Sequence, residues 1–174
     1  SILALLQRIP STAGVVLSAG FEVLAWNPLA AALMEDFSAR LLGDRNLART
    51  AFLTGGPGET SLYGISDASD FARQAVAELR VAHARYPEDA VIAALVDELR
   101  QGSSLFSALW DRHDVETRPM LTKTFDHPIV GPITLDCDAL HLSDQDQHLI
   151  LYTAPDGSRA SEQLAFLGTI GQTH

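Results

Sequence analysis

One stretch decides the fold at the start of the chain: Val15-Val16-Leu17-Ser18-Ala19-Gly20-Phe21-Glu22-Val23-Leu24-Ala25-Trp26-Asn27-Pro28. Valine, leucine and tryptophan favour extended backbone, so residues 15–17 and 22–26 predict two strands, and Gly20 suits the turn between them. Asn27 is a preferred N-cap residue and Pro28 suits the first helical position. The opening is therefore predicted to be a hairpin followed by a helix.

Helical periodicity dominates the middle of the chain. Apolar residues recur near the 3.6-residue period over residues 69–86, 91–99 and 105–113, and Gly102 is expected to cap the second of these helices. Shorter helices are predicted over residues 3–9, where Pro10 follows, and over residues 46–53. Because each long helix has one apolar face, these helices must pack on each other or on a sheet.

After Pro119 the apolar period changes to two, which predicts strands over residues 120–125, 133–138 and 148–154. The continuous run Leu149-Ile150-Leu151 favours a central strand that is buried on both faces. A last helix is predicted over residues 161–167. Two strands, several helices and then three strands predict an α+β fold, in which an antiparallel sheet has helices inserted between its N-terminal hairpin and its three C-terminal strands.

Composition excludes several classes of protein. The 174 residues carry 12 basic and 22 acidic side chains, a net charge of −10, which argues against direct binding of nucleic acid. The single cysteine, Cys137, excludes an internal disulfide framework and fits a reducing compartment, so we expect a cytoplasmic location. No apolar run reaches the roughly 20 residues of a membrane span. The length predicts one domain over residues 1–174.

Catalytic motifs do not assemble in this sequence. It has no nucleophile elbow or phosphate loop, so we expect a protein that is not an enzyme and has no cofactor. A metal-dependent hydrolase is a remote alternative, since Asp136 and Asp138 share a strand face and His141 and His148 are near in sequence.

An ordered set of motifs resembles one family. It runs from 23–33 (VLAWNPLAAAL) through 45–49 (RNLAR), 86–89 (YPED), 106–115 (FSALWDRHDV) and 127–131 (HPIVG) to 155–158 (PDGS). This order is similar to that of the C-terminal ligand-binding domain of MmyB-like transcription regulators, which are common in actinobacteria. The sequence departs from the family pattern at Ala68, Leu121 and Cys137, so any of these that lines the pocket would alter the size of ligand it accepts.

The resemblance implies a PAS-like sensor domain that binds a small apolar molecule of fatty-acid type. In the family such a domain follows a helix-turn-helix domain of the xenobiotic-response-element type, which this sequence does not contain. DNA is therefore expected as a partner only through that missing domain.

The expected ligand cavity lies between the sheet and the long helices. Its walls are predicted to include the following apolar residues: Trp26, Phe52, Leu79, Phe106, Leu109, Trp110, Met120, Phe125 and Leu135. Three basic side chains are candidates to meet a carboxylate head group: Arg49, His113 and Lys123.

A second hypothesis makes the domain a dimerisation or protein-interaction module with a solid core. Its symmetric interface would contain Ile129, Val130, Leu5 and Phe166, and we expect a homodimer. The two hypotheses are compatible with each other.

Overall fold

The computed structural model describes residues 1–55, 58, 62–64, 68–113 and 122–171. Its elements are, in chain order, α1 (Ile2–Gln7), β1 (Ala13–Ser18), β2 (Val23–Trp26), α2 (Pro28–Leu33), the 3-10 turn η1 (Phe37–Ala39), α3 (Leu47–Leu53), α4 (Ala68–Arg85), α5 (Ala90–Gly102), α6 (Ser104–Arg112), β3 (Thr122–His127), β4 (Gly131–Leu142), β5 (Gln147–Thr153) and α7 (Arg159–Gly171). None of the described helices is both long and apolar enough to cross a membrane.

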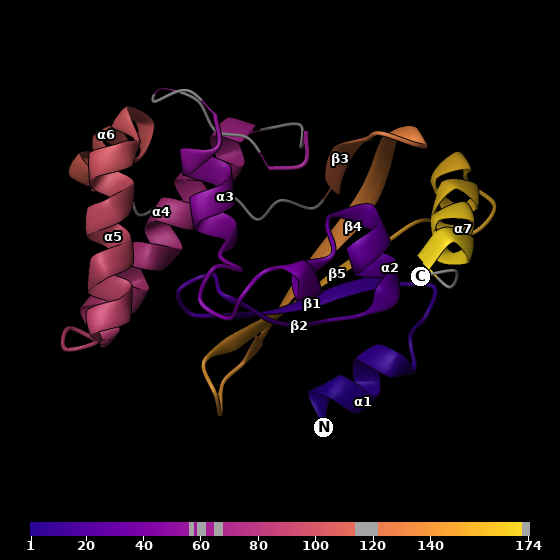
Figure 1. Ribbon diagram of the computed structural model, residues 1–174, viewed down its shortest axis with the longest axis horizontal. Coiled ribbons are helices and arrows are strands. Elements are labelled where there is room, and N and C mark those ends of the chain that lie inside the picture. The colour runs from indigo at the N-terminus through magenta and orange to yellow at the C-terminus, as the bar shows by residue number, and fades with distance from the viewer. Residues whose placement is uncertain (56–57, 59–61, 65–67, 114–121, 172–174) are drawn as a thin grey trace.

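The five strands form one antiparallel sheet in the order β2-β1-β5-β4-β3 (Figure 1). Helices α2 to α6 are inserted between the N-terminal hairpin and the last three strands, which confirms the α+β, PAS-like arrangement. Strand β5 pairs with β1 on one side and β4 on the other. This central position explains its unbroken apolar run, because both of its faces are covered.

Asn27 joins the hairpin to the helix that follows. Its side-chain oxygen accepts hydrogen bonds from the backbone N–H groups of Ala30 and Gly14, at 3.0 and 3.1 Å. Its amide nitrogen donates to the carbonyls of Thr12 and Ile9, at 2.6 and 3.3 Å. The predicted N-cap is confirmed, and the same buried amide also fixes the chain between α1 and β1.

The sheet has different neighbours on its two faces. Helix α1 covers the outer face, where Leu6 packs with Val16, Ala25 and Leu149. The other helices lie on the inner face, with α3 to α6 grouped at one end and α2 and α7 at the other (Figure 1). Since strand side chains alternate, Val15 and Leu17 point inward while Val16 points toward α1.

Helices α5 and α6 begin at side chains that accept backbone hydrogen bonds. Asp89 caps α5 by accepting from the N–H groups of Val91 and Ile92, and Ser103 caps α6 by accepting from Phe106. Gly102 is the last residue of α5 rather than its cap, which corrects the prediction. A Cβ at Gly102 would lie 2.5 Å from Leu53 Cδ2, so this glycine allows α3 to approach α5 closely.

Candidate functional site

A cavity of about 240 Å³ lies between α4 and the inner face of the sheet. Inward side chains of β1, β3, β4 and β5 form one wall of the cavity. Residues on successive turns of α4 form the opposite wall. The lining residues are Val15, Leu17, Ser18, Phe21, Leu47, Leu62, Phe71, Gln74, Ala75, Glu78, Lys123, Cys137, Asp138, Ala139, His148, Ile150 and Tyr152. Most of this lining is apolar, as in small-molecule sites generally.

Lys123 is the one lysine in the sequence, and it lies in this cavity. Its side chain is 8% exposed, and its ammonium is 5.4 Å from the ring centre of Phe71 and 5.6 Å from that of Tyr152. Within the described part of the chain, the amine makes no hydrogen bond or ion pair. Burial lowers the pKa of Lys123 below its usual value, because the charged form loses its hydration.

The polar side chains of α4 form the opposite edge of the cavity. Gln74 donates a 3.1 Å hydrogen bond to Glu78, one turn further along the helix. The carboxylate of Glu78 favours the protonated form of Lys123, but less strongly than burial opposes it. The cavity therefore holds a basic group whose charge is only partly compensated.

Cys137 and Tyr152 face each other across β4 and β5 on the cavity wall. Burial raises the pKa of both side chains, so both are neutral at pH 7. Tyr152 also packs edge-on against Phe125, with ring centres 5.1 Å apart. Of the three departures from the family pattern, Cys137 lines the cavity; Leu121 and the side chain of Ala68 lie outside what the structure describes.

The structure gathers several predicted wall residues away from this cavity. Phe52, Phe106 and Trp110 pack against one another in the layer of helices, with ring centres 5.2 Å apart for the first pair and 5.7 Å for the second. Trp26 packs on Phe37 with 5.5 Å between ring centres. The other predicted apolar residues are buried in the core without lining the cavity: Leu79, Leu109, Phe125 and Leu135. Met120 lies outside the described residues.

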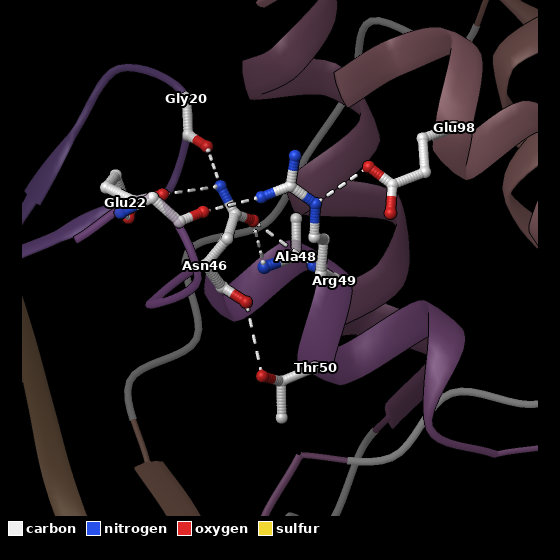
Figure 2. Close-up of polar contacts among 8 residues, drawn as sticks. Gly20, Glu22, Asn46, Ala48, Arg49, Thr50 and Glu98 are labelled. Atoms are coloured by element: carbon white, nitrogen blue, oxygen red, sulfur yellow. Dashed lines mark hydrogen bonds and ion pairs between the residues drawn. The ribbon is translucent and has the colours of Figure 1, made fainter. Parts of the chain in front are cut away.

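Arg49 and His113 each have protein partners. Arg49 Nε is 2.8 Å from Glu98 Oε2, an ion pair that connects α3 to α5 (Figure 2). Asn46, the N-cap of α3, also donates to the carbonyl of Gly20 at 2.8 Å and so holds α3 against the hairpin turn. His113 ends α6 in the left-handed conformation, 2.8 Å from Arg80 Nη1. Of the three candidate anchors, Lys123 is the one in the cavity.

Sequence reasoning missed most of the α4 wall. Phe71, Gln74, Ala75 and Glu78 occupy positions i, i+3, i+4 and i+7, which is one face of a helix. The signal was present, because Gln74 and Glu78 interrupt an otherwise apolar stripe. Polar residues on a buried helix face are typical of a site rather than of a solid core.

The proposed metal ligands Asp136, Asp138 and His141 do not come together. Side chains alternate along β4, so the two aspartates share a face and His141 points to the other. Among the described residues, the group with metal-ligand spacing is His141, Asp146 and His148. The two aspartates of the metal hypothesis therefore lie on the opposite face of β4 from His141, whereas His148 is the cross-strand partner of His141.

Comparison with known protein families places almost the whole chain in one of them. Residues 1–167 match the family described as "MmyB-like transcription regulator ligand binding domain". No curated protein matches the sequence.

Proposed function

Because this chain belongs to the MmyB-like transcription regulator ligand-binding domain family, we propose that its cavity binds a medium-chain carboxylic acid. The apolar chain would lie between α4 and the sheet, and its carboxylate would contact the amine of Lys123. In this proposal the domain senses the acid without converting it. Another domain of the regulator would contact DNA, since the net charge of −10 opposes contact between this domain and phosphates.

The observation that carries the proposal is the burial of Lys123. A buried ammonium without an ionic partner costs folding free energy, and proteins avoid it unless the group has a use. A carboxylate entering the cavity would supply an ionic partner that the described residues do not supply, through a charge-assisted hydrogen bond. The surrounding rings of Phe71 and Tyr152 would keep that contact away from water, which strengthens it.

The size of the cavity limits the length of the acid. A protein cavity of about 150 Å³ accommodates benzene, which has six heavy atoms, so 240 Å³ holds roughly ten. An eight-carbon acid has that number of non-hydrogen atoms. The cavity also favours a ligand-binding role over a module with a solid core.

The test is calorimetric titration of the purified chain with octanoate and, as a neutral ligand of equal length, octanol. We expect octanoate to bind and octanol to bind at least ten-fold more weakly, because it lacks the charge that pairs with Lys123. Lys123→Met should remove this preference by weakening octanoate binding at least ten-fold. Arg49→Ala and His113→Asn serve as matched controls and should bind octanoate as the unmodified chain does.

Two results would overturn the proposal. Equal affinity of the Lys123→Met variant and the unmodified chain for octanoate would show that the amine is not the anchor. A loss of octanoate binding in Arg49→Ala, with a normal circular dichroism spectrum, would show that Arg49 on α3 is an anchor for the carboxylate. Lys123 is the sole lysine, so reductive methylation of its amine gives a second readout. The extent of methylation is compared with and without octanoate, which should protect the amine.

We also propose that the domain forms a homodimer through α7 and the turn between β3 and β4. Ile129 and Phe166 are large apolar side chains that are 61% and 52% exposed, so both are available for an apolar contact. Gln163 on α7 donates to the carbonyls of Val130 and Pro132, so the two elements lie against each other. Leu5, the other predicted interface residue, is exposed on α1 at the opposite face of the sheet.

A further inference from the structure

Two histidines and an aspartate meet where β4 turns into β5. His141 and His148 are direct cross-strand partners, and their ring centres are 5.1 Å apart. Asp146 lies in the turn between the two strands, in the left-handed backbone conformation with φ of 47°. The register of the hairpin therefore places two imidazoles and one carboxylate on the same side.

The donor atoms of the three side chains are close enough for one ion. One ligand atom from each residue lies within 4.8 Å of the others, and His141 Nε2 is 2.8 Å from Asp146 Oδ1. Tetrahedral zinc with bonds near 2.0–2.1 Å places its ligand atoms about 3.3 Å apart. The three ligand atoms are therefore already close to the spacing that zinc requires.

The second oxygen of Asp146 is held by the end of α4 and the residue beyond it. Asp146 Oδ2 accepts a 2.6 Å hydrogen bond from the Tyr86 hydroxyl and a 3.1 Å bond from Arg85 Nη1. The hydrogen bonds from Tyr86 and His141 lower the pKa of Asp146 to about 2, so the carboxylate is charged at neutral pH. These contacts leave Oδ1 directed at the histidines, as outer-shell partners orient the ligands of metal sites.

We propose that His141, Asp146 and His148 bind a zinc ion, with water in the fourth position. Imidazole nitrogen and carboxylate oxygen are ligands that zinc prefers, and a three-ligand set with an open position is a recurring zinc arrangement. The ion can enter from solvent, because the side chain of His141 is 44% exposed. Arg85 contacts the oxygen that faces away from the histidines, so zinc need not displace it.

Titration of the full chain with zinc chloride, followed by calorimetry, tests the proposal. We expect one zinc per chain, with at least ten-fold weaker binding in His148→Asn, in Asp146→Asn and in His141→Gln. Magnesium should not bind, because it prefers oxygen ligands. His113→Asn is the matched control: this histidine also lies at the surface, and asparagine tolerates its left-handed backbone.

A second measurement keeps the test independent of folding defects in the variants. Nitrogen-15 spectra of the imidazoles in the unmodified chain should show zinc-dependent shifts for two histidines, which the variants identify as His141 and His148. Undiminished zinc binding in His148→Asn and His141→Gln would overturn the proposal, as would the absence of a stoichiometric zinc in the unmodified chain. His148 also lines the cavity, so the zinc titrations are carried out without octanoate, and the test of octanoate binding rests on Lys123→Met.

Discussion

At the scale of single residues, Lys123 shows what alternation in a strand can and cannot predict. The period-two pattern places Lys123 and Phe125 on the same face of β3, and both are buried in the structure. Sequence therefore offered a reason to consider an inward lysine. It did not indicate that Phe71 and Tyr152 would surround the amine, because those contacts depend on how α4 crosses the sheet.

Replacement of Lys123 by methionine should stabilise the domain in the absence of ligand. The unfolded chain binds a proton on Lys123 up to a pKa of 10.5, whereas the folded chain releases it at lower pH because burial lowers its pKa. Between these two pKa values the unfolded state holds more protons on Lys123, so the contribution of this residue to stability rises with pH. At neutral pH, where the ammonium is buried, the variant should gain on the order of 1–3 kcal/mol.

Urea unfolding followed by circular dichroism, between pH 7 and 10, measures both effects. The stability difference between the Lys123→Met variant and the unmodified chain should shrink toward pH 10, because the folded chain then releases the proton of Lys123. The raised pKa of Cys137 lowers the stability of both chains in this range and cancels in the comparison. Should the variant be less stable than the unmodified chain at pH 7, Lys123 would have a structural partner, and the interpretation of its burial as a functional feature would be wrong.

At the scale of elements, the sequence predicted helices and strands well and their contacts less well. The caps at Asn27 and Ser103 have local causes, since each side chain bonds to backbone three residues away, and the predicted cap at Asn27 is confirmed. The aromatic residues are different. Phe106 and Trp110 stack on each other rather than on the sheet, and no local pattern distinguishes these two choices.

Helix α4 supplies a direct test of the cavity through Ala75. This residue lines the cavity and is 1% exposed, so leucine at this position would extend into the 240 Å³ space. We expect Ala75→Leu to weaken octanoate binding at least ten-fold with little loss of stability, because the added side chain fills volume that is otherwise open. Calorimetry with octanoate and thermal unfolding measure the two effects.

The matched control for this substitution is Ala84→Leu, which places the same change on an exposed position of the same helix. It should bind octanoate normally. If Ala75→Leu folds and binds as tightly as this control, the acid occupies a different place in the molecule.

At the scale of the whole molecule, the sequence predicted which strand is central in the sheet, but it did not predict the register between neighbouring strands. The central position of β5 follows from its apolar run, which has a physical cause in burial on both faces. The meeting of His141 with His148 depends on the length and geometry of one turn. A shift of one residue would place them on opposite faces, and sequence alone does not exclude that shift.

The homodimer is tested by light scattering on protein eluting from a size-exclusion column. A chain of 18.8 kDa should elute with twice that mass, and the double variant Ile129→Asp with Phe166→Asp should elute as a monomer, because aspartate opposes apolar contact. Val91→Asp is the control, since Val91 is 75% exposed on α5, away from the proposed interface. A monomeric unmodified chain, or a dimeric double variant, would contradict the proposal.

A single strand, β1, lies between the cavity and the N-terminal helix α1. Val15 and Leu17 line the cavity on one side, and Val16 supports Leu6 of α1 on the other. The amide of Asn27 fixes the connection between them at Ile9 and Thr12. Displacement of β1 by an occupant of the cavity therefore also displaces the surface on which α1 rests. Under the proposed function, the orientation of α1 would then differ between the empty and the occupied domain.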